Sequence, residues 1–265
     1  MDEEHTEPWF IRARRAGWGA CRGGYRTFFP NPRTLIVLAL FLTTVFVMIN
    51  VMVFSERHAY EVCEKRDIIF ETIGYFPSLV ELSNSLGHIV VVFTIANLFF
   101  CFNTDRGTIL RRGVLILTGC YMMRTLTLAV TIQPPLRGPV EELDGHFTEV
   151  FRVLVFGKLL KTDEMFSGHT CAFLICLFHL YKYHPRHILG SRLAYLLVFA
   201  FTAVVSVFGM LILVVAQLHY TSDVVVAAFL VTLLYHYYHL LIQDVKCPRW
   251  LLWLDGHVSH NQLPI

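Results

Sequence analysis

Charge is scarce in this chain. Only 16% of its 265 residues are charged, compared with about 25% in an ordinary soluble protein. A disordered chain would hold far more charge, and a nucleic-acid-binding protein would carry a large basic excess, whereas the formal net charge here is only +2. Seven cysteines are too few for a small disulfide scaffold. The sequence is therefore not that of a disordered chain, a nucleic-acid-binding protein or a small disulfide scaffold. With 55% hydrophobic residues, it is that of an integral membrane protein.

The apolar residues are grouped in six continuous blocks rather than in alternating segments, which favours membrane helices over the strands of a barrel. About 20 residues of helix cross a hydrocarbon core of roughly 30 Å. The expected spans are Thr34–Phe54, Leu86–Phe102, Gly113–Ile132, Phe166–Tyr183, Leu193–Val215 and Ser222–Ile242. The sequence therefore predicts an all-α, polytopic membrane protein with six transmembrane helices.

Lysine and arginine predict the orientation of these spans. Thirteen of them lie in the two termini and the loops on the same side, against seven in the loops at 55–85 and 133–165. Those two loops also hold twelve of the twenty acidic residues. Both termini are therefore expected to be cytosolic. The chain then divides into a basic arm at 1–33, a membrane domain at 34–242 and a short cytosolic tail at 243–265.

Ionisable residues gather where two expected spans begin. The fourth span opens with Phe-Ser-Gly-His-Thr at 166–170, and the sixth with His-Tyr-Thr-Ser-Asp at 219–223. By the predicted orientation both openings lie on the lumenal face, so we expect His169 and His219 to converge although they are fifty residues apart. Ionisable residues at membrane depth are costly and usually functional, which points to a shared site.

The residue types in these two openings suit phosphoryl transfer. His219 and Asp223 have the i, i+4 spacing of neighbours on a helix, so the carboxylate could accept the Nδ1 proton and leave Nε2 as a nucleophile. Backbone amides at Ser167 and Gly168, at the start of a helix, suit a phosphate group. His169 beside them could protonate a leaving alkoxide. Either motif alone could be a helix cap or a polar pair, whereas the two together predict a phosphotransfer site.

These motifs resemble those of the sphingomyelin synthase family, a branch of the type 2 phosphatidic acid phosphatase superfamily. The match is full at 219–225, and at 166–170 together with Asp163, although the family's preceding Cys-Gly is replaced by Lys-Thr. A third motif, from Arg111 to Pro134, has the family's order and spacing, whereas the family's Pro-Leu-Pro-Asp is only weakly echoed at 77–81. The phosphatases of the superfamily carry an arginine six residues before the second histidine, where this chain has Leu213.

The resemblance implies the transfer of a phospho-head group, most simply phosphocholine, from a glycerophospholipid to the primary hydroxyl of ceramide, with release of diacylglycerol. His219, oriented by Asp223, would carry the head group, and His169 would act as acid and then as base, without a metal or other cofactor. The residues expected to contact substrate are Ser167, Gly168, Tyr121, Arg124 and Tyr220, although a structural partner for Arg124 is an open alternative.

The same resemblance implies a location and partners. The protein is expected in the Golgi or the plasma membrane, with its active site on the lumenal or exoplasmic face. Ceramide and glycerophospholipid within the bilayer are the expected partners, a homo-oligomer is compatible with the sequence, and nucleic acid is not expected as a partner.

Other readings stay open. His-x-x-His pairs at 184–187, 236–239 and 257–260 could hold the two irons of a membrane hydroxylase or desaturase. A receptor or scaffold that kept the fold without the chemistry is a second class, but it would be favoured by a broken His/His/Asp set, and the set is intact. Among enzymes, phosphatidylethanolamine or phosphatidylinositol could be the donor, or diacylglycerol the acceptor of phosphocholine.

Overall fold

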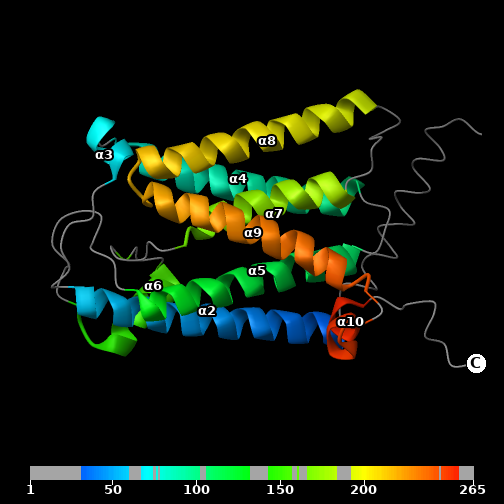
Figure 1. The fold of residues 1–265 in the computed structure, drawn as a ribbon, viewed down its shortest axis with the longest axis horizontal. Helices are drawn as coiled ribbons and strands as arrows, with labels where there is room; N and C mark the ends of the chain where they lie inside the picture. Colours follow the sequence, from blue (N-terminus) through cyan, green and yellow to red (C-terminus); the bar gives the residue numbers. More distant parts are fainter. Residues whose placement is uncertain are drawn as a thin grey trace, which may run out of the picture.

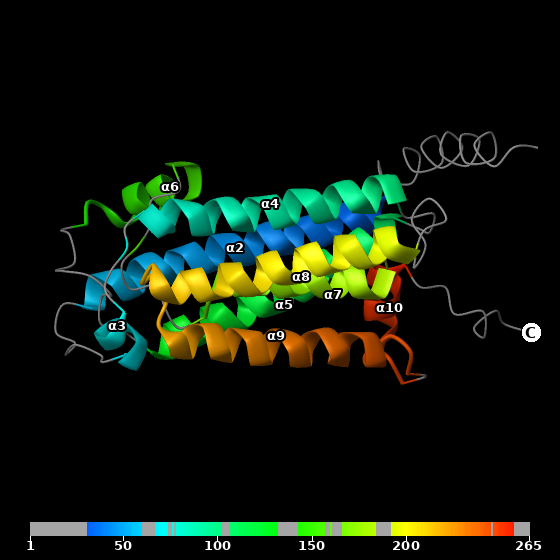
Figure 2. The same cartoon turned by 90° about the horizontal axis from the view of Figure 1, so that it is seen from above.

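The computed structural model describes residues 31–59, 67–73, 76, 78–101, 106–131, 143–156, 160, 166–183, 192–244 and 246–256. All regular secondary structure within these ranges is helical. Figures 1 and 2 show the long helices aligned along one axis as a bundle. The predicted all-α fold is therefore confirmed. The basic arm lies almost wholly outside the described residues.

Five helices among the described residues are long and apolar enough to cross a membrane. They are α2 (Pro32–His58), α4 (Ser78–Cys101), α5 (Arg106–Val130), α8 (Arg192–Val215) and α9 (Thr221–Leu241). These helices correspond to five predicted spans, although α4 begins at Ser78 rather than Leu86. The fourth predicted span is α7 (Gly168–Tyr183), whose 16 residues are fewer than the roughly 20 that cross a hydrocarbon core. The structure thus supports five spans by length and composition, and the sixth stays a prediction.

The short helix α7 lies in the middle of the bundle, where it contacts α4, α5, α8 and α9. Cys171 and Phe173 on α7 are completely buried. The outer surface of the bundle also carries large apolar side chains, among them Met122 and Tyr237, which are 56% and 62% exposed. Large apolar side chains on the surface of a helical bundle suit contact with lipid.

Three short helices were not predicted from the sequence. α3 (Ile68–Thr72) and α6 (His146–Phe156) lie at the end of the bundle where α9 begins, and α10 (Arg249–Asp255) lies at the opposite end (Figure 1). Helices this short are marginal in isolation and depend on tertiary contacts, so a local pattern says little about them. The segment expected to be a simple tail therefore contains a helix, which packs against α2 and α5.

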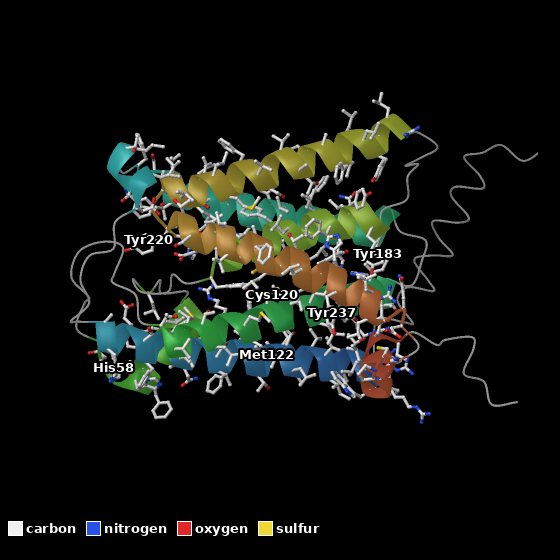
Figure 3. All side chains as sticks on the ribbon, in the orientation of Figure 1. His58, Cys120, Met122, Tyr183, Tyr220 and Tyr237 are labelled. Carbon is white, nitrogen blue, oxygen red and sulfur yellow. The ribbon has the colours of Figure 1, made fainter. Side chains whose placement is uncertain are left out.

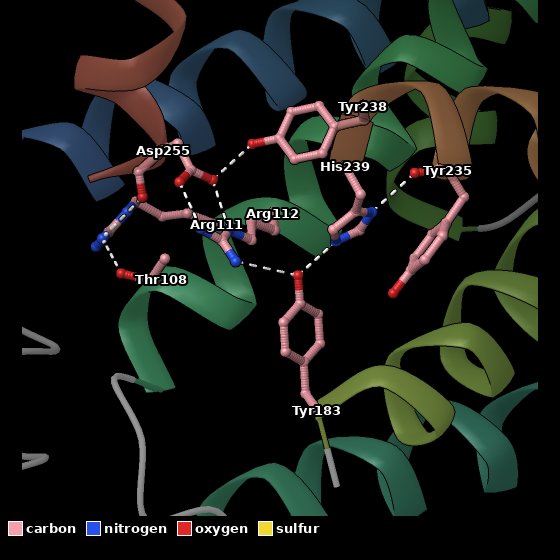
Figure 4. Close-up of polar contacts among 8 residues, drawn as sticks. All are labelled: Thr108, Arg111, Arg112, Tyr183, Tyr235, Tyr238, His239 and Asp255. Carbon is pink, nitrogen blue, oxygen red and sulfur yellow. Dashed lines mark hydrogen bonds and ion pairs between the residues drawn. The ribbon is translucent and has the colours of Figure 1, made fainter. Parts of the chain in front are cut away.

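A buried ion pair holds α10 against the bundle (Figure 4). Arg112 donates to both carboxylate oxygens of Asp255 at 2.7 Å, and the hydroxyl of Tyr238 donates to the same carboxylate at 2.8 Å. Arg112 also donates to the hydroxyl of Tyr183, which in turn hydrogen-bonds Nε2 of His239. This network joins α5, α7, α9 and α10 at one end of the bundle.

Candidate active site

A cavity of about 460 Å³ lies inside the bundle, with walls from α2, α4, α5, α6 and α7 and from the turn between α8 and α9. Most of its wall is apolar, as a lipid site requires. The predicted site residues that line it are Tyr121, Arg124, Gly168, His169 and His219. Three separate parts of the sequence therefore meet at one cavity.

The two histidines face each other across this cavity. The ring centroids of His169, on the first turn of α7, and His219, between α8 and α9, are 6.4 Å apart, with the ring planes at 61°. Reacting atoms approach to roughly 3 to 3.5 Å before bonds change. Two rings at this separation can therefore contact opposite sides of one phosphorus centre, and the predicted convergence of the histidines is confirmed.

A tight turn after α8 presents His219 to the cavity. The backbone N–H groups of Leu218 and His219 both donate to the carbonyl of Leu213, at 2.9 and 3.3 Å. Gln217 adopts the left-handed conformation, with φ of 51°, that such a helix C-terminus requires. The imidazole is buried at 6% exposure, so the turn fixes both the position and the surroundings of this ring.

The expected hydrogen bond between His219 and Asp223 is not present, and this part of the prediction is wrong. Nδ1 of His219 is buried without a hydrogen-bond partner among the described residues. The Asp223 carboxylate instead accepts from the backbone N–H of Tyr220 at 3.0 Å and from the hydroxyl of Ser222 at 3.1 Å. The helix α9 begins only at Thr221, so His219 precedes it and the i, i+4 spacing does not apply.

Ser167 and Tyr220 support the site rather than line the cavity. The hydroxyl of Ser167 accepts from the backbone N–H of Thr170 at 3.2 Å and so caps the start of α7. The ring of Tyr220 is buried and stacks on Phe70 of α3, with centroids 5.4 Å apart. Figure 3 places Tyr220 at the α3 end of the bundle. These two residues and Asp223 thus hold the two helix starts in place.

Arg124 and Gly168 meet at the start of α7. A Cβ atom on Gly168 would lie 2.7 Å from Nη1 of Arg124 and 3.7 Å from the hydroxyl of Tyr121. Glycine therefore lets the guanidinium approach the helix start closely. An arginine beside the amides of a helix N-terminus forms a site suited to an anion such as a phosphate group.

The electrostatic surroundings favour a neutral His219. Burial lowers the pKa of its imidazole well below the usual value of 6.5, and the positive charge of Arg124 and the neighbouring His169 lower it further. A neutral imidazole has a lone pair for nucleophilic attack. The positive charge that suits Arg124 to bind an anion therefore also helps to keep His219 in the neutral form that can act as a nucleophile.

Asp67 is a residue of this region that the sequence analysis missed. Its carboxylate accepts from the backbone N–H of Thr221 at 2.8 Å, from the Thr221 hydroxyl at 3.0 Å and from the N–H of Ile69 at 2.9 Å. Burial opposes ionisation, but these hydrogen bonds outweigh it and lower the pKa of Asp67. Asp67 thus fastens the start of α9, two residues after His219. In the sequence, the acidic residues of the loop at 55–85 indicated only the orientation of the spans, and nothing singled out Asp67 among them.

The iron-site alternative finds little support in the part of the chain that the structure describes. No three His, Cys, Asp or Glu side chains gather there as possible metal ligands. His239 uses Nε2 for its hydrogen bond with Tyr183, and His236 bonds the carbonyl of Thr232 through Nδ1. The other two His-x-x-His pairs lie outside the described residues.

Comparison with known proteins agrees with the motifs. A family model described as "PAP2 superfamily C-terminal" matches residues 162–240, the segment from just before α7 to the end of α9. Phosphatidylcholine:ceramide cholinephosphotransferase 2 of Caenorhabditis elegans is 29% identical over 194 residues, which cover 62% of this chain and 54% of that protein.

Two vertebrate proteins are also similar. Phosphatidylcholine:ceramide cholinephosphotransferase 1 of Gallus gallus is 28% identical over 151 residues, which cover 51% of this chain and 34% of the relative. Sphingomyelin synthase-related protein 1 of Homo sapiens is 27% identical over 188 residues, which cover 66% of this chain and 43% of the relative. The matched region is thus about a third to a half of each of these three relatives. The family match, the relatives and the two histidine motifs thus agree: the chain is similar to the PAP2 superfamily over residues 162–240, and to proteins named as ceramide cholinephosphotransferases and sphingomyelin synthase-related proteins.

Proposed function

We propose that this protein is a phosphosphingolipid synthase. It transfers a phospho-head group, with phosphocholine as the favoured group, from a glycerophospholipid to the primary hydroxyl of ceramide, and it releases diacylglycerol. The observation that carries the proposal is the meeting of His169 and His219, 6.4 Å apart, in a mostly apolar cavity that Arg124 also lines. Relatives named as phosphatidylcholine:ceramide cholinephosphotransferases favour choline as the head group.

The reaction has two displacements at one phosphorus atom. Nε2 of neutral His219 attacks phosphorus, the bond from phosphorus to the glycerol oxygen breaks, and His169 gives that oxygen a proton. The ceramide hydroxyl then attacks the phosphohistidine, His169 takes its proton, and the bond from phosphorus to nitrogen breaks. Arg124 and the amides at the start of α7 bind the phosphoryl oxygens in both steps.

Asp223 acts in this scheme as a positioning residue. Its carboxylate binds the N–H of Tyr220, the residue next to His219, and so fixes the backbone that carries the nucleophile. Ser167 does the same for His169 by capping α7. The reaction needs water to be excluded, because hydrolysis of the phosphohistidine would otherwise compete, and a cavity inside a membrane bundle suits that need.

The placement in the cell belongs to the same proposal. Six spans would include α7, both termini would be cytosolic, and the site would face the lumen or exterior in the Golgi or plasma membrane. The positive-inside distribution of lysine and arginine is the argument for this orientation.

The proposal is tested with purified protein in vesicles. Labelled ceramide is offered with phosphatidylcholine, phosphatidylethanolamine or phosphatidylinositol, and the lipid product is identified. We expect phosphosphingolipid from phosphatidylcholine, whereas no ceramide product with any donor would refute the proposed function. The His219→Gln variant should lose transfer, while His236→Gln, which changes a histidine of α9 outside the cavity, should keep it.

The covalent intermediate has its own test. Phosphatidylcholine labelled in its phosphate is mixed with the protein without ceramide, and the protein is separated from lipid. An acid-labile label should remain on the wild-type chain and be absent from His219→Gln. Retention of that label by His219→Gln would show that another residue is the nucleophile.

A further inference from the structure

One face of helix α4, a stripe that includes the polar residues Asn84 and His88, lines the cavity beside His169. Asn84, Gly87, His88 and Val91 all line the cavity. Their spacing of three, four and seven residues puts them on one face of the helix. A Cβ atom on Gly87 would lie 3.3 Å from Cδ2 of His169. This stripe therefore borders the reaction centre directly.

The hydrogen bond of His88 determines which of its ring nitrogens donates and which accepts. Nδ1 lies 2.7 Å from the backbone carbonyl of Asn84. A carbonyl oxygen can only accept, so Nδ1 carries the hydrogen of the neutral ring and Nε2 is a hydrogen-bond acceptor. Among the described residues no group donates to this Nε2. The side-chain amide of Asn84, one turn away, offers both an acceptor and a donor.

A histidine and an asparagine within an apolar span are costly unless they bind something. His236 is a useful comparison, because it makes the same bond to the carbonyl four residues earlier but lies outside the cavity. Both histidines are exposed at the surface of their helices, but His88 also lines the cavity. An acceptor atom there requires a ligand that donates a hydrogen bond.

We propose that Asn84 and His88 form the subsite that recognises the acceptor lipid through its hydrogen-bond donors. A ceramide carries an amide N–H and a secondary hydroxyl near the primary hydroxyl that reacts. A diacylglycerol has ester groups in the corresponding region, which can accept but not donate. Nε2 of His88 therefore favours the sphingoid acceptor and disfavours the glycerolipid. This inference rests on the ceramide acceptor of the proposed function.

The test compares two acceptors in the same vesicles. Protein in phosphatidylcholine vesicles receives labelled ceramide or labelled diacylglycerol, and the labelled phospholipid is measured in each case. Diacylglycerol exchange reverses the first displacement, so it reports on the phosphohistidine without ceramide. For His88→Phe we expect the ratio of ceramide transfer to diacylglycerol exchange to fall about tenfold, the size of one lost hydrogen bond of about 1.4 kcal/mol. His88→Gln keeps an acceptor near the position of Nε2 and should restore most of the ratio.

His236→Phe is the matched control and should leave both rates unchanged. A ratio that stays at the wild-type value in His88→Phe, even if both rates fall together, would overturn the subsite. Failure of the proposed function looks different, because the wild-type protein itself would then make no ceramide product. That result would overturn the inference as well.

Discussion

Nη1 of Arg124 lies so close to Gly168 that a Cβ atom at residue 168 would be 2.7 Å away from it. Real Cβ atoms do not approach a nitrogen so closely, so a side chain at this position must displace the guanidinium or the start of α7. The relationship joins the third predicted span to the start of the fourth in one contact. It also explains why a glycine precedes the histidine that we propose as the acid.

Gly168→Ala should therefore lower head-group transfer by about 100-fold, since a misplacement near 1 Å can have an effect of that size. The folded state should persist, because only one methyl group is added. Initial rates and thermal midpoints of both proteins give the measurement. Gly145→Ala is the control, since its Cβ would lie 3.4 Å from Thr148, an ordinary contact. Wild-type transfer by Gly168→Ala would contradict a close role for Arg124.

The lowered pKa of His219 predicts the acid side of the pH profile. Burial, followed by the charge of Arg124, keeps the ring neutral below the usual value of 6.5. Protonation of His219 should therefore not lower the transfer rate as pH falls through 6.5, and a decline from this ring should begin only well below that pH. The free energy of unfolding should also fall at acid pH. The unfolded ring binds a proton near pH 6.5 and the folded ring does not, so protonation favours the unfolded state below that pH. A rate that already halves near pH 6.5 would contradict this environment.

The hydrogen bonds from Thr221 to Asp67 predict a stability effect. Asp67→Ala should lower the free energy of unfolding by about 2 kcal/mol, the size of a hydrogen bond to a charged group. It should also reduce transfer, because Asp67 fastens the helix that follows His219. Thermal midpoints in detergent and transfer rates test both effects. Glu81→Ala, which removes an exposed carboxylate, should change neither.

The sign of the pH effect at Asp67 follows from its lowered pKa. The stabilisation is fully present above the unfolded value of 3.8 and is lost as pH falls through the lower folded value. Loss of stability by wild type in this range should exceed that of Asp67→Ala. Equal acid sensitivity of the two proteins would contradict the role of the Asp67 carboxylate.

The sequence could predict the meeting of His169 and His219, because convergence depends only on the number and direction of the spans between them. It could not predict the partner of Asp223. Where α9 begins is set by Asp223 and by Asp67, which is 154 residues from Thr221 in the sequence. A local i, i+4 rule cannot include such a distant contact.

The polar stripe of α4 was missed for a similar reason. Hydropathy placed the start of that span at Leu86, which left Asn84 outside it and His88 as its one ionisable residue. Nothing in the sequence shows that this helix face lines the same cavity as His169. Only packing of α4 on α7 brings the two together.

The ion pair between Arg112 and Asp255 predicts a second stability effect, at the other end of the bundle. Asp255→Ala leaves a guanidinium that is only 13% exposed without its carboxylate partner. Removing one member of a buried pair costs about 3 kcal/mol. Transfer per folded molecule should not change, since α10 does not line the cavity.

The double variant Arg112→Leu/Asp255→Leu provides the control, because it removes both charges. It should recover part of the lost stability relative to Asp255→Ala. Unfolding midpoints of Arg112→Leu, Asp255→Leu and the double variant give the coupling energy. Strictly additive effects would show that the pair does not hold α10.

The left-handed backbone of Gln217, with φ of 51°, shapes the turn that presents His219. Gln217→Gly should raise stability by about 1 kcal/mol, since glycine adopts this conformation without a Cβ clash. Gln217→Val should lower both stability and transfer, since a β-branched residue strongly disfavours the left-handed region. Both variants remove the Gln217 side chain, so their difference isolates the backbone. If Gln217→Val matched Gln217→Gly in thermal midpoint and transfer rate, the turn conformation would not be what positions the nucleophile.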